Sequence, residues 1–179
     1  MLESWRLRFG TWYARFHFRR AGDPVVHFTQ AVSESRRAIV LLPESASALS
    51  STGSVLEFLE DRFHTSKVVL VVKKELVLHM PEHRGFNLFT YGPEELNRWF
   101  VPRPELLRKM KKSTFDLALD LNQGFALPSS FLCRASQAPL RIGFVKPYAD
   151  DFYNFQVRTT QVKDPSQAYS TLLKCIEMF

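Results

Sequence analysis

The sequence predicts a three-layer, Rossmann-like α/β domain with a mostly parallel sheet of about five strands and helices on both faces. Short apolar runs without strict polar alternation recur along the chain, which is typical of strands buried on both faces. Helical segments separate these runs, as in a parallel sheet built from crossover connections. The 179 residues fit one core, because two cores of fewer than about 100 residues each would be marginal. We therefore predict one domain over residues 1–179.

Five segments are expected to form the strands. They cover residues 38–42, 67–72, 87–91, 115–121 and 140–145. The third is the weakest and follows the turn-forming stretch from Pro81 to Gly85. The other four are rich in apolar residues, which indicates strands in the interior of the sheet.

An amphipathic helix at about residues 4–20 is predicted by aromatic residues that recur at helical spacing. These are Trp5, Phe9, Trp12, Tyr13 and Phe16. The helix should end near Gly22, Asp23 and Pro24. Further helices are expected at residues 55–63, 93–100, 104–110 and 131–135. A last one should begin at Asp164 as N-cap, with Pro165 in its first turn.

Composition and spacing exclude several classes of protein. With 45% hydrophobic residues, the chain has ordinary globular composition and should fold. The two cysteines and five histidines share no disulfide or zinc spacing, so we predict no metal and no cofactor. No secretory leader is evident, and no apolar run approaches the roughly 20 residues that span a bilayer. These features favour a cytoplasmic protein.

The formal net charge of +6 favours an anionic partner. The basic residues gather in two clusters, Arg6, Arg8, Arg15, Arg19 and Arg20, and Arg103, Arg108, Lys109, Lys111 and Lys112. No helix-turn-helix, RNP or zinc pattern accompanies them, so nucleic acid is disfavoured as a partner. The first helix has three alternatives: packing on its own domain, docking on a protein partner, or docking on an anionic membrane surface. The last would place the protein peripherally at the inner membrane.

A ligand crevice is expected at the carboxyl ends of the strands, where the loops after residues 42, 121 and 145 meet. The first loop carries no Gly-x-Gly-x-x-Gly and no P-loop lysine, so neither standard nucleotide site is indicated. Helix N-termini at such an edge attract anions. We predict a shallow polar crevice for a small anionic ligand, lined by Ser45, Ser47, Asn122, Gln123 and Lys146. The alternative is that these are ordinary capping and turn residues.

Two acidic residues in the fourth predicted strand, Asp116 and Asp120, could be read as a catalytic pair. Four positions apart in a strand, they lie more than about 12 Å from each other. That separation argues against joint catalysis, and Asp120 is expected to fix loop backbone. Cys133 and Cys175 lie among apolar neighbours and are interpreted as small buried hydrophobic residues.

The strand Phe115-Asp116-Leu117-Ala118-Leu119-Asp120-Leu121 is followed by a small-residue helix, by Arg141-Ile142-Gly143-Phe144, and by Tyr153-Asn154. In this order the segments resemble the bacterial ADP-heptose:lipopolysaccharide heptosyltransferases, glycosyltransferase family 9. The resemblance covers residues 38–160. It implies the N-terminal, acceptor-side Rossmann-like domain of a two-domain GT-B enzyme, or a short one-domain relative of unknown role.

Two departures from that family bear on activity. The family carries a Gly-Asp pair before its first helix, with Asp as candidate base, and an ungapped match puts Ala48 and Leu49 there. Leucine accepts no proton, and Glu44 is the nearest carboxylate. The family binds its donor mainly in a C-terminal domain, which would fall beyond Phe179. We therefore predict no catalytic residue and a non-catalytic binding or assembly domain; the alternative is the acceptor half of a split glycosyltransferase whose donor domain is on another chain.

Overall fold

Six parallel strands form the sheet of this computed structural model, in the order β3-β2-β1-β4-β5-β6. The structure describes residues 2–19, 28–82, 85–159 and 164–178. The strands are β1 Ala38–Leu41, β2 Val68–Lys73, β3 Asn87–Tyr91, β4 Leu117–Asp120, β5 Leu140–Phe144 and β6 Phe155–Val157. The predicted fold class is confirmed, with one strand more than expected.

Seven α-helices accompany the strands in the part of the chain that the structure describes. They are α1 Leu2–Phe18, α2 Phe28–Glu34, α3 Ala46–Ser50, α4 Gly53–Arg62, α5 Pro104–Met110, α6 Leu127–Ala135 and α7 Pro165–Glu177. Short 3-10 helices are η1 Thr65–Lys67, η2 Lys74–His79, η3 Pro93–Glu95 and η4 Ala149–Asp151. The expected end of the first helix, at residues 22–24, lies outside the described residues. At α7 the Asp164 carboxylate accepts from the Ser166 amide at 3.0 Å, as the predicted N-cap requires.

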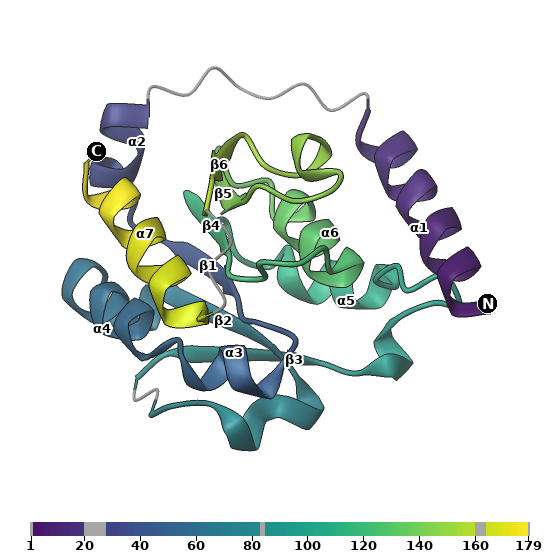
Figure 1. Cartoon of the computed structure of the whole chain (residues 1–179), viewed down its shortest axis with the longest axis horizontal. Coiled ribbons are helices and arrows are strands. Elements are labelled where there is room, and N and C mark those ends of the chain that lie inside the picture. The colour runs from purple at the N-terminus through teal and green to yellow at the C-terminus, as the bar shows by residue number, and fades with distance from the viewer. Residues whose placement is uncertain (1, 20–27, 83–84, 160–163, 179) are drawn as a thin grey trace.

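The sheet separates two apolar cores, and successive residues of β1 face opposite ones. Val40 packs in the core that holds side chains of α4 and α7, whereas Ile39 and Leu41 pack with α5 and α6. Figure 1 shows the same division, with α4 and α7 on one side of the sheet and α5, α6 and α1 on the other. Burial on both faces explains why these strands read as continuous apolar runs.

β1 lies at the centre of the sheet, between β2 and β4. Ala38 pairs with Val68 on one side and with Leu117 on the other. At the amino ends of β1 and β4, the Asp116 carboxylate accepts a hydrogen bond from the backbone amide of Arg37 at 2.9 Å. The chain passes from β1 to β2 in one direction and returns later to β4 in the other. This reversal is the topological switch point at which open α/β sheets bind ligands.

The prediction of a helix at residues 93–100 is wrong. Only η3, Pro93–Glu95, is helical there, and Leu96 then forms an isolated antiparallel bridge with Pro102. Phe100 takes a left-handed backbone conformation, with φ of 61°. A phenylalanine in this region is uncommon and is held there by its surroundings. The turn places its side chain at the carboxyl edge of the sheet.

The N-terminal helix α1 packs on the domain through a face that the aromatic pattern did not predict. Ala14 is fully buried, and Leu7 packs against the same core as α6. At Gly10 the approach is so close that an added Cβ would lie 2.1 Å from the Trp99 carbonyl oxygen. Arg15 pairs with Asp151 at 2.7 Å. The aromatic residues lie on the other side of the helix and are exposed.

Candidate functional site

Three adjoining cavities run along the carboxyl ends of the strands. A switch-point cavity of about 440 Å³ lies beside the ends of β1 and β4, and a central cavity of about 360 Å³ follows it. An outer cavity of about 320 Å³ lies beyond β2 and β3. Glu44 lines the first two and Lys73 the last two, so the three cavities are neighbours along this edge, which is called here the cleft.

The switch-point cavity contains four of the five predicted ligand residues, Ser45, Ser47, Asn122 and Gln123. Ser45 caps α3, since its hydroxyl accepts from the Ala48 amide at 3.4 Å. Asn122 joins the two loops, because its side-chain oxygen accepts from the Glu44 amide at 2.9 Å. The loops after β1 and β4 therefore meet as the sequence predicted. Ligand binding by these residues stays a prediction.

Lys146 does not line this cavity, and its predicted place is wrong. Only 1% of its side chain is exposed, and its ammonium group lies 3.0 Å from the Asp120 carboxylate. It also donates to the backbone oxygen of Asn122 at 2.6 Å. The ammonium group is buried because the ionised Asp120 carboxylate, at the end of β4, is itself shielded from water and needs a partner of opposite charge. The cavity consequently contains no charge from this lysine.

Asp120 is the centre of a buried polar network beneath the cleft. Its Oδ1 accepts from the Asn122 amide at 3.1 Å and from Ser129 Oγ at 3.0 Å, and its Oδ2 accepts from the Tyr153 hydroxyl. Burial alone would raise the pKa of Asp120, but Lys146 and the hydrogen bonds from Tyr153 and Asn122 outweigh it and lower that pKa. Asp120 is thus an ionised structural group, as expected from its place in the strand.

The residues that carry the family resemblance lie around this network. Burial, and then the charge of Asp120, raise the pKa of Tyr153 well above its ordinary value, so its hydroxyl stays a donor. A Cβ at Gly143 would lie 2.9 Å from the Tyr153 ring, which explains glycine there. Asn154 Oδ1 accepts from the Arg141 amide at 2.8 Å and fixes β5 to the following loop. The motif is therefore structural: Tyr153 anchors Asp120, and Asn154 holds the amino end of β5.

The central cavity contains a carboxylate with both oxygens engaged. Glu44 pairs with Lys73 at 2.7 Å through Oε2 and accepts from the Tyr91 hydroxyl at 2.9 Å through Oε1. Burial, and then the charge of Glu44, raise the pKa of Tyr91, which stays protonated. Leu49, the residue matched to the family's base, is fully buried in the core and does not line the cleft. Glu44 is the side chain that reaches the cleft from the end of β1.

Lys73 and Tyr91 were missed by the sequence reasoning. Lys73 is the last residue of β2 and Tyr91 the last of β3. The rule that ligands gather at the carboxyl ends of parallel strands applies to these two strands as well. Inspecting the end of every predicted strand, and not only of three, would have found both residues.

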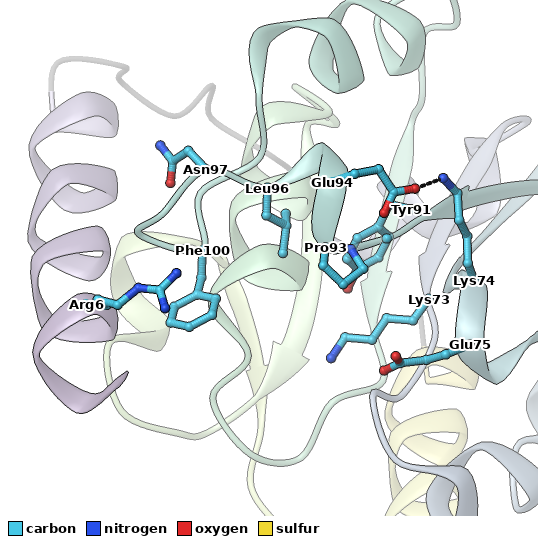
Figure 2. A pocket seen from close by; sticks show the side chains of 11 residues that line it. Arg6, Lys73, Lys74, Glu75, Tyr91, Pro93, Glu94, Leu96, Asn97 and Phe100 are labelled. Carbon is cyan, nitrogen blue, oxygen red and sulfur yellow. Dashed lines mark hydrogen bonds and ion pairs between the residues drawn. The ribbon is translucent and has the colours of Figure 1, made fainter. Parts of the chain in front are cut away.

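The outer cavity has apolar walls and charged groups at its rim (Figure 2). The Arg6 guanidinium of α1 lies 4.7 Å from the centroid of the Phe100 ring, within range of a cation–π contact. Lys74 is held by the carboxylates of Glu94 and Glu95, the latter at 3.0 Å. Through Arg6, the N-terminal helix borders the cleft.

The acidic, histidine and cysteine side chains of the described residues are the candidates for holding a metal ion. No group of three or more His, Cys, Asp and Glu side chains there is arranged to hold a metal ion. Cys133 is fully buried, and burial raises the pKa of its thiol; it forms no disulfide with the partly buried Cys175. Within the described ranges, no helix has the length and apolar character needed to cross a membrane.

Comparison with known proteins supports the fold. No protein-family model matches the sequence, and no curated protein sequence matches it significantly. Among solved structures the chain is similar to a glycosyl transferase family 9 protein from Veillonella parvula DSM 2008, with a TM-score of 0.62 and 16% sequence identity. The match covers 80% of this chain and 42% of that one, so the chain spans less than half the length of its structural neighbour. The fold is therefore glycosyltransferase-like.

Proposed function

We propose that this domain binds a hydroxyl-rich ligand, a sugar or sugar phosphate, in the carboxyl-edge cleft and does not transfer glycosyl groups on its own. The lack of transfer is proposed because both carboxylate oxygens of Glu44 are already engaged. Lys73 and Tyr91 engage both of its oxygens. A general base must accept a proton during the reaction, and protonating Glu44 would break its ion pair with Lys73.

The lining of the switch-point cavity favours hydroxyl groups over a strongly anionic guest. Ser45, Ser47 and Gln123 present neutral donors and acceptors, and Lys146 is buried beneath them. In a concave site, a few precisely placed polar groups orient a small ligand. A sugar, with many hydroxyls, matches this lining better than the free phosphate or carboxylate expected from sequence.

Thermal shift with neutral sugars, sugar phosphates and nucleotide sugars tests the binding. A ligand at about 100 times its dissociation constant stabilises the native state by about 2.7 kcal/mol, which raises Tm by roughly 5–10 °C in a domain of this size. Ser47→Trp should abolish the shift by filling the cavity. Ser50→Trp is the matched control, since Ser50 is exposed on the same helix and does not line the cavity. A shift that survives Ser47→Trp, or no shift with any of these compounds, refutes the proposal.

The lack of transfer is tested separately. The purified chain is incubated with nucleotide sugars and lipid acceptors while nucleotide release is followed. We expect no release above the uncatalysed rate. Turnover that is abolished by Glu44→Gln would identify Glu44 as the base and overturn the non-catalytic part of the proposal.

A second candidate is the acceptor half of a split glycosyltransferase, which would make this chain the counterpart of the N-terminal domain of a heptosyltransferase. The coverage of 42% of the structural neighbour favours it. The test mixes the chain with a separate polypeptide that carries a donor-binding domain and measures heptose transfer from ADP-heptose. Transfer that requires both chains supports this candidate, and none in any combination argues against it.

A further inference from the structure

Five aromatic side chains on α1 form a continuous exposed surface, called here the aromatic face. Its members are Trp5, Phe9, Trp12, Tyr13 and Phe16, and their exposed fractions run from 40% for Phe9 to 69% for Trp5. The Trp12 ring centroid lies 5.6 Å from that of Phe9 and 5.9 Å from that of Phe16, so these three rings pack together. Contiguous exposed apolar surface on a folded domain marks an interaction site.

Packing within the domain does not account for the aromatic face. The helix is attached through its other side, where Gly10 meets the Trp99 backbone and Ala14 is fully buried. Figure 1 shows α1 at the outer side of the molecule, beyond α6. Four of the five aromatic residues could be replaced without opening the core; Phe9 is the exception, since its ring lies 4.5 Å from Trp99.

Positive charge flanks this surface. Arg8 and Arg19 are exposed; at 100° per residue Arg8 falls beside the aromatic face, and Arg19 directly follows the last residue of α1. Glu3 is the one acidic residue of α1, and it lies in the first turn. Tryptophan and tyrosine favour the membrane–water interface, and arginine can extend from beside a buried face toward lipid phosphates. The chain as a whole carries a formal charge of +6.

We propose that the aromatic face of α1 docks on an anionic lipid surface, with the helix lying parallel to the bilayer. The helix of 17 residues is about 25 Å long and presents a convex surface, which a fluid bilayer can accommodate along its whole length. Docking holds the cleft within about one helix diameter, roughly 10 Å, of the bilayer surface, because Arg6 and Leu7 of the same helix line it. The proposal is independent of what the cleft binds.

Co-sedimentation with vesicles tests the proposal. The protein should bind vesicles of phosphatidylglycerol mixed with phosphatidylcholine, with a blue shift of tryptophan emission, and should bind pure phosphatidylcholine at least tenfold more weakly. Trp5→Ser combined with Trp12→Ser should lower affinity at least tenfold and leave Tm unchanged. Leu78→Ser is the matched control, since Leu78 is 95% exposed on η2, and it should bind as the wild type does.

A second variant keeps the test decisive if the tryptophan pair should lower Tm. Arg8→Glu with Arg19→Glu changes exposed residues only, and should weaken binding about 30-fold or more and reduce its salt dependence. Vesicle binding that neither variant changes overturns the proposal. A concentration-dependent dimer that the tryptophan variant abolishes, with no vesicle binding by the wild type, would instead assign the aromatic face to a second copy of this chain.

Discussion

The buried pair of Asp120 and Lys146 offers the sharpest test at the scale of single residues. Asp120→Asn should leave the Lys146 ammonium buried with no charged partner, at a cost of about 3–5 kcal/mol in unfolding free energy. Adding Lys146→Met should recover much of that loss, because both charges are then gone. Urea unfolding of the wild type, single and double variants measures this. A double variant no more stable than Asp120→Asn would contradict it.

The same carboxylate makes stability depend on pH. Because the pKa of Asp120 is lowered in the folded state, its contribution is present above the ordinary value of 3.8 and is lost as pH falls through the folded-state value. Tm of the wild type should therefore fall in acid. The Tm of the Asp120→Asn/Lys146→Met variant should fall less in acid. The difference between the two curves of Tm against pH then reports the contribution of Asp120 alone, because the exposed carboxylates are the same in both proteins. Parallel Tm curves would contradict the assignment.

Gly143 is predicted to tolerate no side chain. A Cβ there meets the Tyr153 ring at 2.9 Å, and that ring is fixed by its hydrogen bond to Asp120. Gly143→Ala should cost about 1–3 kcal/mol, as overpacking does, and lower Tm by roughly 2–4 °C per kcal/mol. Gly53→Ala is the control, since nothing lies within 4 Å of a Cβ there. Equal effects of the two changes would refute the steric explanation.

At the scale of elements, the attachment of α1 depends on one close approach. Gly10→Ala gains about 1 kcal/mol of helix propensity, but the new Cβ would lie 2.1 Å from the Trp99 carbonyl oxygen, which is backbone and cannot rotate away. We expect α1 to loosen at a net cost of about 1–2 kcal/mol. Limited proteolysis should then cut α1 faster than in the wild type. Arg8→Ala, on the exposed side of α1, should leave the rate unchanged.

Comparing predicted and observed strands and helices shows which sequence patterns were sufficient to identify an element. β1 and β2 are buried on both faces, so their apolar runs identified them within one residue at each end. β6 was missed because Phe155–Val157 is a three-residue edge strand with a half-buried glutamine at its centre. The helix predicted after Pro93 failed because the Asn97 side chain accepts from the backbone of Val101 and closes a turn instead.

The candidate site was predictable where topology alone decides it. In a parallel sheet, polar residues after neighbouring strands meet at one edge, and this rule placed Ser47 and Asn122 in one cavity. It could not place Lys146, because the sequence does not reveal that Asp120 is buried and takes the ammonium group. Leu49, which the ungapped match put at the family's base position, lies one helical turn into α3 and faces the core.

For the molecule as a whole, the order of the strands predicts a gradient of stability. β1 and β4 are central and paired on both sides, whereas β3 and β6 are the edges of the sheet. Backbone amides of β1 and β4 should exchange with deuterium slowest, near the rate of global unfolding, and those of β3 and β6 faster. Hydrogen exchange read by mass spectrometry checks this order. Edge peptides as protected as the central ones would contradict it.

The central place of β1 also has a consequence during synthesis. β2 and β3 can pair with β1 as soon as they leave the ribosome, but the other edge of β1 waits for β4, which is translated much later. Until then Ala38–Leu41, wholly apolar, is an open strand edge of the kind that pairs with other nascent chains. Overexpression at high temperature should therefore yield inclusion bodies, and slower translation or chaperone supply should shift the protein into the soluble fraction.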